Sequence, residues 1–156
     1  SDLRFLELLE RDGTHQNDLE RKALFFILSG NYDLYKKVDH IYDFQDRSIK
    51  PEVLGYTEGQ LEENREMGEP WMERCVMCDL PLSEEETYKC TYCHNLPDLC
   101  SSSRRLVQLA FNLYNGYKAD VSDVLCVLDD ENFELAMQAI RIRFNKGGYR
   151  HEQTLI

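Results

Sequence analysis

Four cysteines in two Cys-x-x-Cys pairs constrain the fold of this chain more than any other feature. Cys75 and Cys78 are followed, after eleven intervening residues, by Cys90 and Cys93. A two-residue spacer lets both sulfurs of a pair face the same ion, and two such pairs complete a tetrahedron around Zn²⁺. The spacing predicts a structural zinc site. A site closed by four sulfurs has no open position for water, so it stabilises the fold and does not catalyse.

The cysteines leave alternatives open. Two disulfides or a dithiol redox centre would use the same residues, although a redox pair normally opens a helix in a strand-helix-strand setting that neither pair has. His94 or Cys100 could replace one of the four ligands. Segment 87–93 resembles the strand that enters a zinc-ribbon knuckle, so we expect two short hairpins around the ion. Cys126 lies among apolar residues and is expected to be a buried small hydrophobe.

The residues before the cysteines predict helices. Asp2 can cap a helix that Gly13 ends, with Leu3, Leu6 and Leu9 on one face and Phe5 and Leu8 nearby. A capping box of Asn17 and Glu20 predicts a second helix that ends at Gly30 in the left-handed conformation. Segment 23–28 is apolar nearly all round, so this helix should be central. A third helix is expected from Asn31 to the break at 48–51.

The helical pattern returns after Cys100. One of the serines at 101–103 can cap a helix that ends near Gly116, and a short helix follows from Ser122. Asp129 or Asp130 then caps a last helix that Gly147 and Gly148 end. Its apolar positions are Phe133, Ala136 or Met137, Ile140 and Phe144.

These patterns predict a mainly α fold, in which a helical domain built from both ends of the chain carries an inserted, small zinc-ribbon-like module. We place N-terminal helices at 1–56, an acidic connection at 57–70 and the zinc module at 71–100. The C-terminal helices span 101–147 and complete the helical domain, and 148–156 form a polar tail.

The middle of the chain is strongly acidic. Segment 57–86 holds ten acidic residues and two basic ones. This composition fits a solvated linker with one short helix, or an acidic surface offered to a basic partner. Under the second interpretation the partner-binding residues are Glu62, Glu63, Glu66, Glu69, Glu84, Glu85 and Glu86.

The helical segments also resemble a family of small uncharacterised proteins found in Firmicutes and their mobile elements and phages. The resemblance rests on 18–31 (DLERKALFFILSGN), 40–44 (HIYDF), 49–52 (IKPE), 108–117 (QLAFNLYNGY), 129–133 (DDENF) and 140–144 (IRIRF). It implies a bacterial or phage origin and a helical fold. It transfers no catalytic or binding residue.

Charge limits the classes of function. The chain has 18 Lys and Arg against 29 Asp and Glu, a net charge of −11, which disfavours nucleic acid and anionic lipid as partners. No apolar run is long enough for a membrane helix, and no secretory signal is recognisable, so we expect a cytoplasmic protein. His15 and His40 are weak candidates for a general base, and no catalytic motif is present.

Two functions remain, with a third behind them. The first is a zinc-stabilised acidic regulator that binds a protein with a basic surface, such as a phage or mobile-element inhibitor that occupies the nucleic-acid-binding surface of a host or defence protein. The alternative is a zinc ribbon that binds nucleic acid through Arg74, Lys89, Tyr88 and Tyr92. An enzyme of unknown class is third.

Overall fold

The computed structural model describes residues 2–147, and their fold is mainly α-helical, as predicted. The chain forms two compact units. Residues 2–49 and 99–147 make the helical unit, and Lys50–Asp98 make the cysteine unit. A helical domain assembled from both ends of the chain is therefore interrupted by a segment that carries all four paired cysteines.

The helical unit contains six of the α-helices. They are α1 (Asp2–Asp12), α2 (Leu19–Gly30), α3 (Tyr32–Lys36), α6 (Ser101–Asn115), α7 (Val121–Leu125) and α8 (Asp130–Phe144). A 3₁₀ turn, η1 (Val38–His40), precedes a two-stranded antiparallel hairpin of β1 (Tyr42–Asp43) and β2 (Ser48–Ile49), in which Tyr42 pairs with Ile49.

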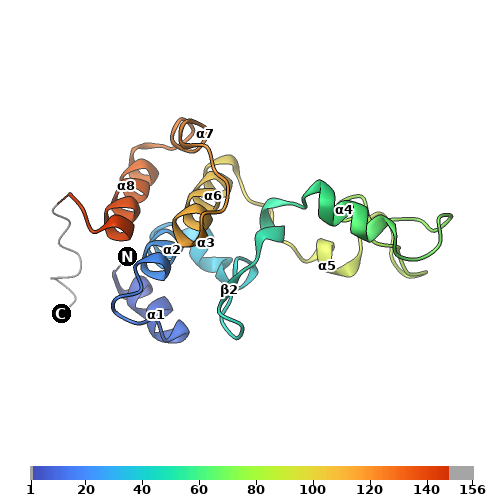
Figure 1. Cartoon of the computed structure of the whole chain (residues 1–156), viewed down its shortest axis with the longest axis horizontal. Coiled ribbons are helices and arrows are strands. Elements are labelled where there is room, and N and C mark those ends of the chain that lie inside the picture. The colour runs from blue at the N-terminus through green and yellow to red at the C-terminus, as the bar shows by residue number, and fades with distance from the viewer. Residues whose placement is uncertain (1, 148–156) are drawn as a thin grey trace. The chain divides into compact units, whose positions relative to one another are not determined.

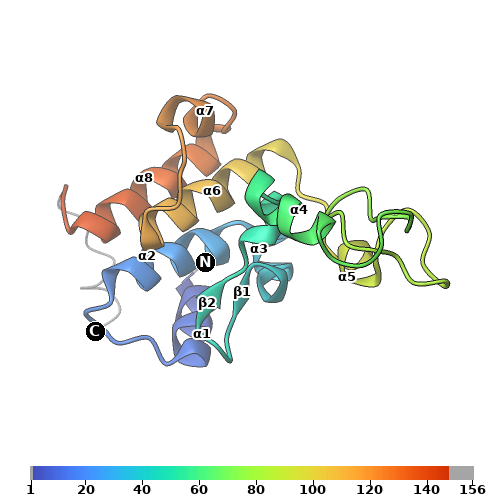
Figure 2. The same ribbon diagram turned by 45° about the vertical axis from the view of Figure 1, so that its right-hand side comes forward.

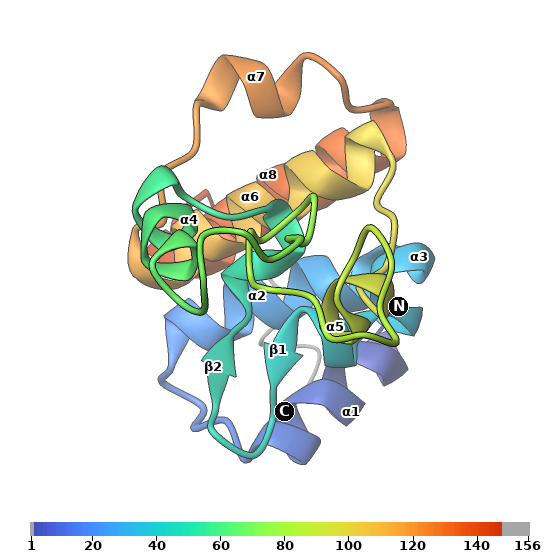
Figure 3. The same cartoon turned by 90° about the vertical axis from the view of Figure 1, so that its right-hand side faces the viewer.

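Helix α2 is the centre of this unit, as its apolar composition predicted. It contacts α1, α3, α6 and α8, and α6 also packs against α7 and α8. In Figures 1, 2 and 3, α7 lies above α6 and α1 lies below α2. Leu24, Phe25 and Ile27 of α2 are fully buried, as are Leu106 and Phe111 of α6. Each such side chain contributes about 1.5–3 kcal/mol, so packing across α2 is a large source of the unit's stability.

The helix caps confirm some predictions and correct others. Asp129 caps α8 and α6 ends at Gly116, both as expected, and Gly116 adopts the left-handed conformation. The predicted cap Asn17 is wrong: α2 is capped by Asp18, whose carboxylate accepts from the backbone N of Arg21. Helix α6 begins after Cys100, with no capping side chain.

Two predicted apolar faces were partly wrong, since Ala136 of α8 is buried as expected but most of the other chosen positions are not. In α1 the buried residues are Phe5, Leu8 and Asp12, while Leu3 is 80% exposed. In α8 they are Ala136, Ala139 and Ile142, while Phe133 and Phe144 are exposed. In both helices the chosen residues satisfied the helical period, but so did a neighbouring stripe, and packing against α2 selected that stripe.

Asp12 is buried because it accepts hydrogen bonds from several side chains. Its carboxylate accepts from Tyr42 at 2.6 Å, from Arg47 at 2.9 and 3.1 Å, and from Thr14. Burial alone raises the pKa of Asp12, but these donors outweigh it and hold the pKa below its ordinary value. The network joins the end of α1 to the hairpin. The hairpin lies where the third helix was predicted to continue, and α3 ends at Lys36.

Gly30 is the last residue of α2 and does not adopt the left-handed conformation predicted for it. A Cβ at this position would collide with the side chain of Leu135 in α8. The glycine therefore permits close approach of two helices.

The cysteine unit has little regular structure. It contains a 3₁₀ turn, η2 (Pro51–Leu54), and the helices α4 (Glu58–Arg65) and α5 (Thr91–His94), with a bridge between Arg74 and Pro81. Thr57 and Gln60 form a capping box at the start of α4. Within residues 2–147, every helix is too short or too polar to cross a lipid bilayer.

Candidate metal centre

The four paired cysteines come together in the cysteine unit. Their Sγ atoms all lie within 4.8 Å of one another, and all four side chains are buried. The Sγ atoms of Cys78 and Cys90 are 3.7 Å apart. Four sulfurs at the Zn–S distance of about 2.3 Å from a tetrahedral centre would be separated by about 3.8 Å. The six cysteines all lie within the described residues 2–147 and are free thiols, so this cluster can hold a metal ion.

The first pair lies in a hairpin-like loop, as expected. The backbone N of Cys75 donates to the carbonyl O of Leu80 at 2.9 Å, and the N of Asp79 donates to the O of Cys75 at 3.0 Å. Asp79 adopts a positive φ of 62° to close the turn. The bridge between Arg74 and Pro81 closes the base of the loop.

The second pair differs from the expected hairpin. Cys90 is the N-cap of α5, and its Sγ accepts from the backbone N of Cys93 at 3.4 Å. The second pair thus begins a one-turn helix. The N–H groups in the first turn of a helix can stabilise a sulfur anion in the same way as they stabilise a capping oxygen. The segment before it is not a strand: Tyr88 has φ 63°, and its carbonyl O accepts from the N of Val76 at 2.8 Å.

Glu86 connects the turn at Ser83 to the start of α5. One carboxylate oxygen accepts from the backbone N of Ser83 at 2.8 Å, and the other accepts from the N and Oγ1 of Thr91 at the start of α5. Hydrogen bonds from the backbone of Ser83 and Thr91 lower the pKa of Glu86 to about 2. This carboxylate is therefore part of the scaffold that positions the second pair.

The sulfurs are in unequal environments. Burial raises the pKa of Cys75, but backbone donors around its sulfur outweigh burial and lower the pKa to about 6. Burial raises the pKa of Cys93 to about 11 and that of Cys78 further. Four thiolates in a buried cluster repel one another, so full ionisation requires a cation among them.

Helix α4 is tied to the first cysteine loop. Nδ2 of Asn64 donates to the carbonyl O of Cys78 at 2.6 Å, and Arg65 forms an ion pair with Asp79 at 2.8 Å. The guanidinium of Arg74 donates to the carbonyl O atoms of Asn64 and Asp79 at 3.0 Å and of Met67 at 2.8 Å. The acidic helix is thereby fixed to the cysteine cluster, and Arg74 is occupied by backbone carbonyls.

Neither of the other candidate ligands belongs to the group of four sulfurs. His94 is exposed on α5 and does not belong to the cluster. Cys100 belongs to the helical unit and hydrogen bonds to Ser103 at 3.3 Å. The prediction that Cys126 is buried was wrong: it follows α7 and is exposed, because Val124 takes the buried position.

The predicted partner-binding glutamates divide into two groups. Glu86 is half-buried and hydrogen-bonded, whereas the remaining six are exposed: Glu62, Glu63, Glu66, Glu69, Glu84 and Glu85. Sequence reasoning missed the structural roles of Glu86 and Asn64. The capping box of Thr57 and Gln60 was a usable signal for α4, but nothing in the sequence indicates where Asn64 or Glu86 would bond.

Comparison with known proteins gives a family and no function. A family model described as a family of unknown function (DUF6075) matches residues 2–64 and 85–154. The unmatched segment 65–84 contains Cys75 and Cys78, whereas Cys90 and Cys93 lie inside the matched region. No curated protein and no solved structure matches the chain.

Proposed function

The chain belongs to DUF6075, a family of unknown function, and we propose that it is a zinc-stabilised binding protein. In this proposal its acidic cysteine unit docks on a basic surface of a partner protein. The observation that carries the proposal is the tether between α4 and the buried sulfur cluster. Closed four-sulfur sites are typical of structural Zn²⁺.

The exposed glutamates supply the binding chemistry. Glu62, Glu63 and Glu66 are exposed on or beside α4, and Glu84 and Glu85 are exposed in the turn before the second pair. Carboxylates held on a fixed frame can substitute for phosphates on a basic surface, and such attraction weakens with salt. A nucleic-acid-binding protein of a bacterial host is the partner that fits this charge best, in keeping with an inhibitor from a phage or mobile element.

The nucleic-acid alternative is weaker. Arg74, the arginine it depends on, already donates to several backbone carbonyl O atoms, and Tyr92 donates to Glu52 at 2.6 Å. Contacts with phosphate would have to replace those bonds. The net charge of −11 opposes them further.

Metal content tests the first half of the proposal. Elemental analysis should give one zinc ion per chain, and chelation should abolish hydrogen-exchange protection in 50–98 while α2, α6 and α8 keep theirs. A metal-free chain with unchanged protection in 50–98 would refute the zinc site.

Affinity capture from a bacterial lysate tests the second half. The bait is the zinc-loaded chain, and the matched bait carries Glu66→Lys, Glu69→Lys, Glu84→Lys and Glu85→Lys. Glu86 is left intact because its substitution would damage the scaffold. Proteins with basic surfaces should bind the first bait and not the second, and should be released by salt. Retention on both baits, or oligonucleotide binding at about 150 mM salt, would contradict the proposal.

A further inference from the structure

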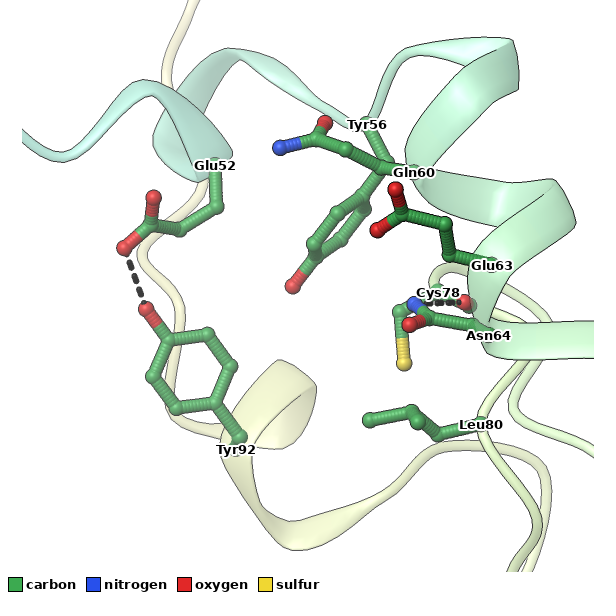
Figure 4. Close-up of a pocket in the computed structure, with 8 residues that line it drawn as sticks. All are labelled: Glu52, Tyr56, Gln60, Glu63, Asn64, Cys78, Leu80 and Tyr92. Atoms are coloured by element: carbon green, nitrogen blue, oxygen red, sulfur yellow. Dashed lines mark hydrogen bonds between the residues drawn. The ribbon is translucent and has the colours of Figure 1, made fainter. Parts of the chain in front are cut away.

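The cysteine unit contains a cavity beside the sulfur cluster. Its volume is about 410 Å³, within the range for small-ligand sites and sufficient for a single side chain. Residues of η2, α4, the first cysteine loop and α5 surround it, and all of them belong to this one unit (Figure 4). They are Glu52, Tyr56, Gln60, Glu63, Asn64, Cys78, Leu80 and Tyr92.

The lining combines two carboxylates with two aromatic rings. Glu52 and Tyr92 are joined by a hydrogen bond of 2.6 Å, which fixes the ring of Tyr92 at one side (Figure 4). The hydroxyl of Tyr56 points into the space, and the carboxylate of Glu63 points toward it from α4. No lysine or arginine is among the residues that line this cavity. Its two glutamates therefore create a negative potential that favours a cation.

We propose that this cavity receives one arginine side chain of the partner protein. The inference rests on the proposed function, since it names the residue of the basic partner that the acidic unit would bind. Within residues 2–147, no hydrogen bond or ion pair engages the carboxylate of Glu63, so both of its oxygens can accept from a guanidinium. Such bidentate pairs are short and strong.

Arginine fits the lining better than lysine. A planar guanidinium can stack on a tyrosine ring while its edge donates to a carboxylate, and it is more weakly hydrated than an ammonium group. Leu80 offers an apolar wall for the aliphatic part of the side chain. Lysine would bring one compact charge that requires more complete hydration.

The cavity depends on the metal centre. Cys78 lines it directly, and Tyr92 lies between the two cysteines of the second pair. The hydroxyl of Tyr56 also lies 3.4 Å from the Sγ of Cys93. Removal of the ion would release both walls, so binding of arginine should require zinc.

Peptide titration followed by ¹H–¹⁵N NMR tests the proposal. The probe is acetyl-Gly-Arg-Gly-amide, and the control replaces arginine with citrulline, which has the same shape without the charge. In the zinc-loaded chain, the arginine peptide should shift the amides of Gln60, Glu63 and Tyr92 and bind at least about tenfold more tightly than the citrulline peptide, the factor that about 1.4 kcal/mol supplies. Equal binding of both peptides, or of a lysine peptide and the arginine peptide, would overturn it.

A matched pair of variants identifies the site. Glu63→Gln keeps the shape of the lining and should abolish the shifts, whereas Glu58→Gln, at an exposed position of the same helix outside the lining, should preserve them. Shifts that vanish in both variants, or in neither, would refute the arginine pocket.

The peptide titration and the partner capture can fail independently, so they test the arginine pocket and the proposed function separately. Failure of the peptide titration, together with partner capture that still depends on Glu66, Glu69, Glu84 and Glu85, would refute the pocket alone. Binding of the peptide, together with capture that is insensitive to those four glutamates, would refute the wider acidic interface alone.

Discussion

Asn64 of α4 donates a hydrogen bond of 2.6 Å from Nδ2 to the carbonyl O of Cys78 in the first cysteine loop. This bond crosses fourteen positions of sequence and fixes an acidic helix to a sulfur cluster. It explains why a segment with the composition of a linker has a defined place in the unit.

Replacement of Asn64 should loosen α4 without removing the metal. Asn64→Ala leaves the carbonyl O of Cys78 without this donor, at a cost of about 1 kcal/mol. Hydrogen exchange in 58–65 should accelerate while zinc content stays at one ion per chain. The control is Glu62→Ala, an exposed position on the same helix. Equal exchange in both variants would show that the bond does not hold α4.

The six cysteines should differ in how fast they are alkylated. In the zinc-loaded chain, iodoacetamide should modify the exposed Cys100 and Cys126 and spare the four buried cysteines. Hydrogen bonds with Ser102 and Ser103 lower the pKa of Cys100 to about 7, so it should react faster than Cys126 at neutral pH. Peptide mapping by mass spectrometry gives the order. Chelation should expose the remaining thiols, and modification of them before zinc is lost would contradict the closed site.

Asp12 should give the helical unit part of its stability against acid. Asp12→Asn removes the charge that Arg47 and Tyr42 face. Asp12 is buried but the Arg47 side chain is 42% exposed, so the loss should be that of hydrogen bonds to a charged group, about 1.5 kcal/mol. Because folding lowers the pKa of Asp12 below 3.8, its contribution is complete above that pH and is lost as the pH falls through the folded-state pKa.

Urea denaturation followed by circular dichroism measures this contribution. The free-energy difference between the natural chain and Asp12→Asn should be constant near neutral pH and should shrink below about pH 4. Asp46→Asn, at an exposed turn position, should change stability by less than about 0.5 kcal/mol. A difference that grows in acid would exclude a lowered pKa for Asp12.

Two glycine-to-alanine substitutions should have opposite effects. Gly30→Ala places a Cβ against Leu135, and an overpacked contact of this kind costs about 1 kcal/mol or more. Gly59→Ala in α4 meets only Thr57 Oγ1 at 3.9 Å and should gain helix propensity, up to about 1 kcal/mol. Thermal unfolding of the helical unit should shift down by about 5 °C for Gly30→Ala. An unchanged midpoint would show that Leu135 moves aside freely.

The parts of the fold that chemistry fixes locally were predictable from the sequence. Two-residue spacers predicted that the sulfurs of Cys75, Cys78, Cys90 and Cys93 gather, and apolar composition predicted a central α2. The buried face of α1 was not predictable, because Leu3, Leu6 and Leu9 follow the helical period as well as Phe5, Leu8 and Asp12 do. Only the position of α2 distinguishes the two stripes.

The contacts of the candidate site also could not be predicted from the sequence alone. Glu84, Glu85 and Glu86 are identical in type and adjacent in sequence, yet only Glu86 reaches the N-terminus of α5. Bonds of this kind depend on where two loops meet, which spacing alone does not determine. The same is true of Asn64 and of the cavity between Glu52 and Glu63.

The hydroxyl of Tyr56 is shared between the arginine pocket and the Sγ of Cys93. A ligand that draws this hydroxyl toward itself also alters the hydrogen bonding of the sulfur that would hold the metal. Binding of the metal in turn alters the hydrogen bonding of the hydroxyl. Thermodynamic linkage makes such an effect reciprocal: the factor by which zinc tightens the arginine is the factor by which the arginine tightens zinc. The partner would then protect the protein against loss of its ion, and zinc supply in the cell would set how much partner is bound.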